Sequence, residues 1–233
     1  SILCQTRCMS NPVLLLHGFT GSVESTWAPT GIMELLTEAG REVIAWDLPG
    51  HGSAEKHHDA AGYADMEQGL VDRLPDGIVD GVGFSMGART LLCMASIAPE
   101  KFGKLVVAGV GRNLFERDEE QAERIAKGVQ GEAADDDVHA QTFARYASEP
   151  GQDGHALAAF MRRRHYPLGS AQFERIIHPV RVVLGSEDFA GPADPLIDAL
   201  SDPSYTELRG CDHFATPKNF GFIDAVLEHF EAF

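Results

Sequence analysis

Residues 78–98 read IVDGVGFSMGARTLLCMASIA, and this stretch decides the fold that we predict for the chain. Its first part, Ile78–Phe84, is an apolar run that predicts a buried strand. Its second part, Met86–Ala98, predicts a helix that ends before Pro99. The pattern Gly-x-Ser-x-Gly lies at the junction, with Ser85 at its centre. A sharp turn from strand to helix exposes the serine hydroxyl above the sheet, and the flanking glycines relieve the crowding. We therefore interpret Ser85 as a nucleophile, with an ordinary strand–turn–helix junction as the alternative.

Short aliphatic runs alternate with helical segments on both sides of this stretch. The pattern is typical of a mostly parallel sheet that is flanked by helices on both faces. The predicted strands are Val13–Leu16, Glu42–Trp46, Ile78–Phe84, Lys104–Val110, Arg181–Leu184 and Tyr205–Leu208. The predicted helices are Trp27–Ala39, Tyr63–Leu74, Met86–Ala98, Pro195–Leu200 and Asn219–Phe233. The sequence therefore predicts the α/β fold class.

One long segment, from Arg112 to Ile177, interrupts this alternation because it contains no strand pattern. It instead predicts three helices, Glu116–Val129, Asp137–Ala147 and His155–Arg164. A helical insertion between two strands is expected to lie over their carboxyl ends, where ligands bind in open α/β sheets. We therefore predict a core of residues 1–111 and 178–233 with a helical lid, residues 112–177, inserted between the two parts.

A serine hydroxyl needs a base within hydrogen-bond reach to act as a nucleophile. In folds with this turn the partners follow in the chain order serine, acid, histidine. His213 follows the last predicted strand in the loop Gly210–Phe214, whereas His229 lies inside the C-terminal helix. We predict His213 as the base. The acid is expected just after Arg181–Leu184, where Glu187 and Asp188 are both candidates.

Acyl transfer also needs hydrogen-bond donors directed at the developing oxyanion. The backbone N–H of Met86, at the start of the helix, is one candidate. The backbone N–H of Phe19 is the second, because His17-Gly18-Phe19 follows the first predicted strand and ends at the same edge of the sheet. We interpret His17 as a structural histidine that supports this loop.

Five blocks of the sequence together resemble the signature blocks of the α/β-hydrolase superfamily, in the same order. These blocks are His17–Phe19, Asp47–Ser53, Gly83–Gly87, Gly185–Asp188 and Asp212–Phe214. The resemblance implies the α/β-hydrolase fold, a helical lid and a Ser85–His213–Asp188 triad, with Asp188 preferred over Glu187. Only a dozen residues precede Val13, so the leading antiparallel hairpin of that family is expected to be short or missing.

A finer resemblance concerns the residues that would hold a substrate. The motifs His17–Ser22 and Ser85–Arg89, together with Trp27, are similar to a pyruvate-eliminating synthase of menaquinone biosynthesis. The resemblance implies that Arg89 binds a substrate carboxylate and that Trp27 lies at the substrate. Within the predicted lid, Arg163 belongs to the triplet Arg162-Arg163-Arg164, which could bind an anion because guanidinium groups pair with carboxylates. A helix-packing role for Arg89 and a solvated helix end for the triplet are the alternatives.

The composition limits the classes of partner. The chain has 233 residues and a formal net charge of −16, so we expect neither nucleic acid nor an anionic membrane as a partner, since both attract basic surfaces. We recognise neither a signal peptide nor a membrane-spanning stretch. The four cysteines, Cys4, Cys8, Cys93 and Cys211, have no metal-ligand spacing. We predict a reduced, cytoplasmic protein, with Cys93 as a buried free thiol.

The expected partner is a small-molecule substrate, and a homodimer is left open. We expect no cofactor and no metal, and we interpret His57-His58-Asp59 as an exposed loop. The predicted function is hydrolysis of a small carboxylic ester or related acyl compound through an acyl-enzyme. The alternatives are a pyruvate-eliminating lyase or a C–C bond hydrolase that uses the same triad. The non-enzymatic alternative is a ligand receptor that binds a small molecule without catalysis.

Overall fold

The computed structural model describes residues 10–233. Our expectations about Cys4, Cys8 and the first nine positions lie outside the described residues. Within residues 10–233 the strands form one six-stranded sheet in which every neighbouring pair is parallel, in the order β2-β1-β3-β4-β5-β6. The strands are β1 (Val13–Leu16), β2 (Val43–Trp46), β3 (Val79–Phe84), β4 (Phe102–Ala108), β5 (Pro179–Gly185) and β6 (Asp202–Leu208). All six correspond to predicted strands, which confirms the fold class.

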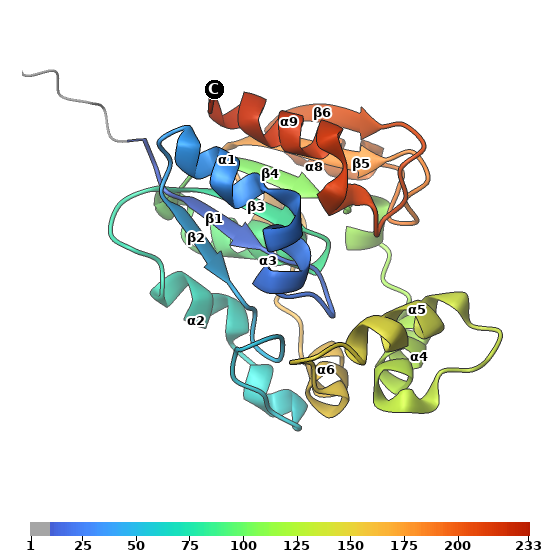
Figure 1. The fold of residues 1–233 in the computed structure, drawn as a ribbon. Helices are drawn as coiled ribbons and strands as arrows, with labels where there is room; N and C mark the ends of the chain where they lie inside the picture. The colour runs from blue at the N-terminus through green and yellow to red at the C-terminus, as the bar shows by residue number, and fades with distance from the viewer. Residues whose placement is uncertain (1–9) are drawn as a thin grey trace, which may run out of the picture.

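Helices cover both faces of this sheet, as Figure 1 shows. Side chains of β1 alternate between the faces, as they do along any strand. Leu14 and Leu16 pack with α2 (Met66–Asp72), α3 (Met86–Ile97) and α8 (Asp194–Ala199). Val13 and Leu15 pack with α1 (Ile32–Glu38) and α9 (Phe220–Phe230). Because both faces are buried, the inner strands are mostly apolar and do not alternate regularly with polar residues.

Two predicted helices are shorter than expected, and the reasons are local. The segment predicted as the helix Trp27–Ala39 forms short turns up to Thr30, and α1 begins only at Ile32. Pro29 and the left-handed Gly31, with φ of 73°, interrupt it. The segment predicted as Tyr63–Leu74 begins as a turn over Ala60–Tyr63, and its helix α2 starts at Met66.

The segment between β4 and β5 is helical, and we call residues 112–177 the helical insert. Its helices are α4 (Glu119–Lys127), α5 (Val138–Ala147), α6 (Gly154–Met161) and the short α7 (Ser170–Phe173). In Figure 1, α4, α5 and α6 form a group of their own beside the sheet. The carboxylates of Asp118, Asp137 and Asp153 accept backbone N–H groups at the starts of α4, α5 and α6, as expected of N-cap residues.

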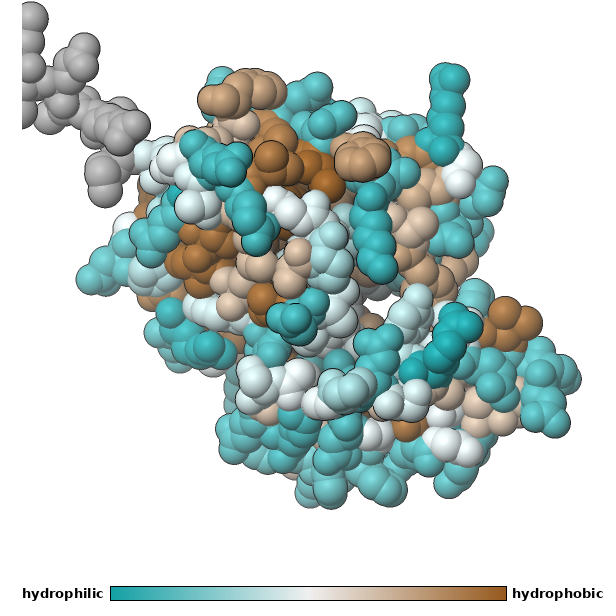
Figure 2. All heavy atoms as spheres, viewed as in Figure 1, coloured by the Kyte–Doolittle hydropathy of each residue, from teal (hydrophilic) through white to brown (hydrophobic). Residues whose placement is uncertain are grey.

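A cluster of apolar side chains holds these helices together, separate from the two clusters of the sheet. The outer surface in Figure 2 is mostly hydrophilic, and it is indented where the insert meets the core. Among residues 10–233, no helix has the length and apolar character needed to cross a bilayer. The insert is held partly by its own cluster and partly by Phe160 and Phe173, which pack into a cluster of the sheet.

A buried ion pair connects several segments at one end of the sheet. Asp80 of β3 pairs with Arg41, and both side chains are buried. Arg41 also donates to the backbone carbonyls of Asn11 and Phe230, at 2.9 Å and 3.1 Å. The carboxylate of Asp80 accepts the backbone N–H of Lys104 at 2.7 Å. One charged pair thus connects β1, β3, β4 and α9.

Replacing Asp80 with alanine is expected to lower the free energy of unfolding by about 3–5 kcal/mol, because it leaves the Arg41 charge buried and unpaired. Urea denaturation measures the change. Asp72→Ala is the matched control, since that carboxylate lies exposed at the end of α2 and, among the residues that the structure describes, accepts only from Gln68. The effect of this variant should stay within about 0.5 kcal/mol. A loss below about 1 kcal/mol for Asp80→Ala would show that the pair is unimportant for stability.

Candidate active site

Ser85 lies at the junction between β3 and α3, in a backbone conformation that few non-glycine residues adopt. Its φ is 54° and its ψ is −116°, and such strain is typical of functional positions. The turn is tight because its glycines lie against other backbone. A Cβ atom on Gly83 would approach Cα of Ala88 to 2.5 Å, and one on Gly87 would collide with the carbonyl oxygen of Leu16. The sequence pattern therefore has a steric cause.

Three side chains from distant parts of the chain form one hydrogen-bonded row at this turn. The Oγ atom of Ser85 lies 2.9 Å from Nε2 of His213. On the other side of the ring, Nδ1 lies 2.9 Å and 3.0 Å from the two carboxylate oxygens of Asp188. A carboxylate only accepts, so Nδ1 carries the proton and Nε2 is free to accept from the serine hydroxyl. His213 and Asp188 are both buried, and Ser85 is partly exposed.

The alternative acid Glu187, the alternative histidine His229 and the neighbouring Asp212 make other contacts. Glu187 is exposed, and the contact with His213 is made by Asp188. Asp212 accepts the backbone N–H of Ala215 at 2.9 Å, so it caps its own loop. In α9, His229 lies 3.2 Å from the backbone carbonyl of Pro179 at the opposite end of β5.

The side chain of His17 fixes the conformation of the loop after β1 through hydrogen bonds to backbone groups. The backbone N–H of Leu48 donates to Nε2 of His17 at 3.0 Å, so Nδ1 carries the proton and donates to the carbonyl of Gly18 at 2.8 Å. Burial lowers the pKa of His17 and keeps the ring neutral. The same carbonyl accepts the N–H of Gly21 at 3.0 Å. Because the Gly18 carbonyl and the Phe19 N–H belong to one planar peptide, fixing the first also fixes the direction of the second.

Two backbone N–H groups are left available beside Ser85. Within residues 10–233, neither the N–H of Phe19 nor that of Met86 donates to a protein acceptor. The N–H of Met86 belongs to the first turn of α3, where such groups have no partner inside the helix. Phe19 and Ser85 line one hollow together. Both groups are therefore free to donate to a ligand.

Ser85 lines two hollows of different chemistry. The first is rich in aromatic side chains, those of Phe19, Phe84, Phe143, Tyr146 and Phe214, and its wall also contains the charged residues Glu149 and Lys218. The second, of about 1710 Å³, is lined mainly by the helical insert and by the loop after β4. Its charged residues are Arg89, Arg112, Arg117, Glu116 and Asp118. A molecule bound at Ser85 can therefore extend into an aromatic-rich space and into a charged one.

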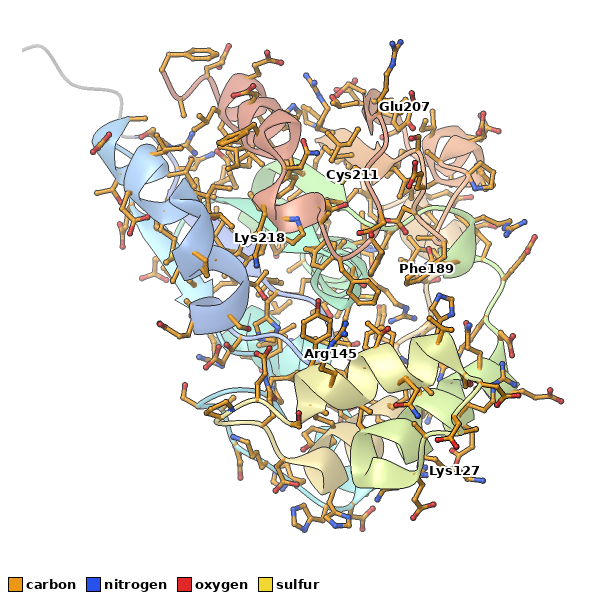
Figure 3. The ribbon with its side chains drawn as sticks, turned by 45° about the vertical axis from the view of Figure 1, so that its right-hand side comes forward. Lys127, Arg145, Phe189, Glu207, Cys211 and Lys218 are labelled. Carbon is orange, nitrogen blue, oxygen red and sulfur yellow. The ribbon has the colours of Figure 1, made fainter. Side chains whose placement is uncertain are left out.

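Phe189 was not predicted as a site residue, although it directly follows Asp188. Its ring lies against the imidazole of His213, with 4.3 Å between the centroids, and it lines the second hollow. In Figure 3, Phe189 and Lys218 extend from the core, and Arg145 belongs to the insert below them. No motif marks Phe189 or Phe143 as a site residue, because aromatic side chains are also common in cores. Phe214 lies in the block Asp212–Phe214, in which only His213 was given a role.

The three residues that we predicted to hold a substrate lie in different surroundings. Arg89 lines the second hollow with Ser85, and its guanidinium donates to the carbonyl of Tyr166 at 2.6 Å. The side chain of Trp27, by contrast, is fully buried against Phe222 on the α1/α9 face of the sheet. Its apolar surface is used for packing and does not reach either hollow.

Arg163 lies in the interior rather than beside Ser85. The side chain is buried outside the two Ser85 hollows, 3.7 Å from the carboxylate of Glu67, with its guanidinium 3.7 Å from the centre of the Phe160 ring. Burial lowers its pKa to about 10. Its neighbour Arg162 pairs with Glu123 at 2.8 Å on the surface. The triplet therefore fastens the insert rather than binding an anion beside Ser85.

A sequence model of the alpha/beta hydrolase fold matches residues 11–149. The chain belongs to the α/β-hydrolase family. The matched region contains the Ser85 turn and the loop that carries Phe19, two of the blocks on which the resemblance was based. The assignment confirms the predicted family and the predicted fold.

Proteins of similar sequence have names that specify different activities. This α/β hydrolase is 35% identical over 104 residues to a 2-hydroxy-6-oxononadienedioate/2-hydroxy-6-oxononatrienedioate hydrolase of Pseudomonas putida, a match that covers 42% of this chain and 36% of that relative. Related hydrolases of Escherichia coli match with 33% identity over 104 residues. An esterase of Mycobacterium tuberculosis is 27% identical over 226 residues, or 94% of this chain and 72% of the relative.

Solved structures show the same fold at low sequence identity. The 2-hydroxy-6-oxo-6-phenylhexa-2,4-dienoate hydrolase of Rhodococcus superimposes with a TM-score of 0.68 and 23% identity, over 96% of this chain and 91% of that one. An esterase of a marine microorganism gives a TM-score of 0.67 and 18% identity, over 94% and 95% of the two chains. These structural similarities show that the same fold extends over nearly the whole chain.

Proposed function

We propose that this α/β hydrolase is a serine hydrolase of small carboxylic esters, with Ser85, His213 and Asp188 as its catalytic triad. One observation carries the proposal: the continuous row of hydrogen bonds from Asp188 through His213 to Ser85, which ends at a hollow. A serine hydroxyl activated by a base that is itself oriented by a third group is the arrangement of nucleophilic acyl transfer.

The reaction would proceed in two halves. The Oγ atom of Ser85 attacks the ester carbonyl carbon while its proton passes to Nε2 of His213. The protonated imidazole then gives this proton to the departing alcohol as the carbon–oxygen bond breaks, which leaves an acyl group on Ser85. A water molecule attacks this acyl carbon, again losing its proton to His213, and the proton returns to Ser85 as the acid is released. Asp188 keeps Nδ1 protonated and stabilises the imidazolium.

The oxyanion of both tetrahedral intermediates would be bound by the N–H groups of Phe19 and Met86. Two observations support this assignment: both groups lie beside Ser85, and within residues 10–233 neither group has a protein acceptor. Donors that are fixed before the reaction stabilise the developing charge most effectively. The helical insert would act as a lid, since its residues form most of the wall of the second hollow and, through Phe143, Tyr146 and Glu149, part of the wall of the first.

C–C bond hydrolysis, or a pyruvate-eliminating lyase reaction, is the second candidate for the same triad. It is favoured by the three arginines of the second hollow, because guanidinium groups bind carboxylates. The names of the Pseudomonas and Escherichia relatives specify dicarboxylate substrates. This candidate requires a substrate with a carboxylate in the second hollow, whereas simple esters need none.

A fluorophosphonate label and a substrate panel test the proposal together. We expect the label to modify Ser85, as located by peptide mass spectrometry, and p-nitrophenyl acetate to be turned over. Thioesters and a 2-hydroxy-6-oxo-dienedioate complete the panel. Faster turnover of the dienedioate than of every ester would favour C–C hydrolysis. Absence of both labelling and turnover would contradict a serine hydrolase of either kind.

Replacing Arg89 with methionine is expected to reduce kcat/KM by about 10–100-fold for substrates that carry a carboxylate, because a charge-assisted hydrogen bond is worth about 1.5–3 kcal/mol. For p-nitrophenyl acetate the change in kcat/KM should stay within about twofold, because this uncharged ester has no carboxylate that could pair with Arg89. Paired kinetics on the two substrates measure the difference. Arg209→Met, at an exposed position, is the control. Equal losses on both substrates would refute a carboxylate-binding role.

A further inference from the structure

The helical insert packs the rings of Phe143 and Phe160 against Phe19 in the loop after β1, and Gln152 adds hydrogen bonds to the same loop. This residue lies between α5 and α6, and its Nε2 donates to the backbone carbonyls of Thr20 at 3.0 Å and Gly21 at 3.1 Å. Those two carbonyls directly follow Phe19, whose N–H is a proposed oxyanion donor. The insert and the proposed oxyanion site are therefore joined by two hydrogen bonds from one amide.

The orientation of this amide is determined by its neighbours. Two carbonyl oxygens face the side chain, so its NH₂ group must point toward them and the oxygen must point away. The oxygen Oε1 is buried there without a hydrogen-bond partner in the described part of the chain. A buried unpaired acceptor costs roughly 1–3 kcal/mol. The contact between Gln152 and the loop is thus kept in spite of a local energetic penalty.

The loop itself needs such support. Thr20 has a φ of 62°, in the left-handed region that disfavours residues with a side chain. His17 fixes the carbonyl of Gly18 on one side of Phe19, and Gln152 holds the carbonyls of Thr20 and Gly21 on the other. Phe19 therefore lies between two anchors, one supplied by the core and one by the insert.

A second contact seats the same part of the insert on the core. The carboxylate of Asp153, next to Gln152, caps α6 and lies 2.8 Å from Nε2 of His58. Gly154 packs so closely against the carbonyl of Val129 that a Cβ atom would collide with it. Gln152 thus extends from a segment whose position is fixed by the helices on both sides of it.

We propose that Gln152 is a positioning residue for the oxyanion site: through the Thr20 and Gly21 carbonyls it aligns the Phe19 N–H, so that the donor is in place when the helical insert is seated. The inference rests on the proposed serine hydrolase function. It assigns to the insert a part in stabilising the transition state, in addition to forming the wall of the substrate site.

Replacing Gln152 with alanine tests this role in the full chain. Losing an oxyanion donor outright costs about 10²–10³-fold in rate, and misaligning a donor that remains present should cost less. We expect kcat for p-nitrophenyl acetate to fall about tenfold while KM stays within twofold. The Kd of phenylboronic acid, whose adduct on Ser85 places a boron hydroxyl at the oxyanion position, should weaken by the same factor. Gln152→Glu should lose at least as much, because its carboxylate faces two carbonyl oxygens.

The chain offers a close control in Gln141 of α5. Its Nε2 also donates to two consecutive carbonyls of the insert, those of Ala133 and Ala134, at an exposed position away from Ser85. Gln141→Ala should leave kcat and the boronate affinity unchanged. If Gln152→Ala does not fold, Gln152→Met, which keeps the length of the side chain, is measured in the same way.

Three results would overturn the proposal: an unchanged kcat, a rise in KM alone, or a fall in kcat without weaker boronate binding. Each would mean that Gln152 does not act through the oxyanion site. Failure of the underlying function looks different, since the wild-type protein would then neither turn over esters nor be labelled at Ser85.

Discussion

Replacing Ser85 with alanine is expected to lower kcat for p-nitrophenyl acetate by about 10⁶-fold, to the residual rate that binding and an oxyanion site give without a nucleophile. The hydroxyl is the atom that bonds to the acyl carbon, and its contact with His213 at 2.9 Å has no substitute nearby. Steady-state kinetics with a fluorophosphonate-labelling control measure the effect. Labelling should disappear together with turnover.

The stability of this variant separates chemistry from folding. Alanine has the same Cβ atom as serine and meets the same strain at a φ of 54°, so the melting temperature should change little. Ser85→Gly should abolish activity equally and raise the melting temperature, because glycine adopts positive φ without penalty. Retention of more than about one per cent of the wild-type rate in Ser85→Ala would contradict the proposed role of Ser85.

Replacing Asp188 with asparagine is expected to lower kcat by about 10⁴-fold with the backbone unchanged. The backbone N–H of Ala190 donates to Oδ1 of Asp188 at 2.8 Å, so the asparagine oxygen would stay there. Its NH₂ group would then replace Oδ2, which lies 3.0 Å from Nδ1 of His213, and would favour the tautomer in which that atom accepts. The proton would move to Nε2, which could no longer accept the proton of Ser85. The pH–rate profile and kcat measure this loss.

The adjacent acid provides the matched control. Glu187 is exposed and precedes Asp188 by one position, so Glu187→Gln removes an equal charge without touching the imidazole. Its kcat should remain within about twofold of the wild type. If the two variants lost activity equally, long-range charge would explain the effect and the hydrogen bond to His213 would not.

The sheet and the Ser85 turn could be predicted from the sequence because each leaves a local signal. Buried strands appear as short aliphatic runs, and the glycines around Ser85 are required by close backbone contacts. The loop after the fifth strand contained two acids, and only the resemblance to a family favoured Asp188. The helix expected from Trp27 failed because the interruption at Gly31 depends on one dihedral angle.

The substrate residues could not be predicted, because their positions depend on contacts between distant segments. Arg163 looked like part of an anion site until its pairing with Glu67, almost a hundred residues away, placed it in the interior. Gln152 has no sequence motif and acquires its contacts only when the insert lies against the loop after β1. The predicted lid, the cytoplasmic location and the homodimer stay predictions.

The two hollows that meet at Ser85 have a consequence for the choice of substrate. Cleavage at a carbonyl bound there separates a molecule into two fragments, one released among aromatic rings and one among arginines. Each fragment is thus selected by a different set of side chains, Phe143 and Phe214 on one side and Arg112 and Arg117 on the other. Protein engineering could alter the tolerance for one half of a substrate while leaving recognition of the other half intact.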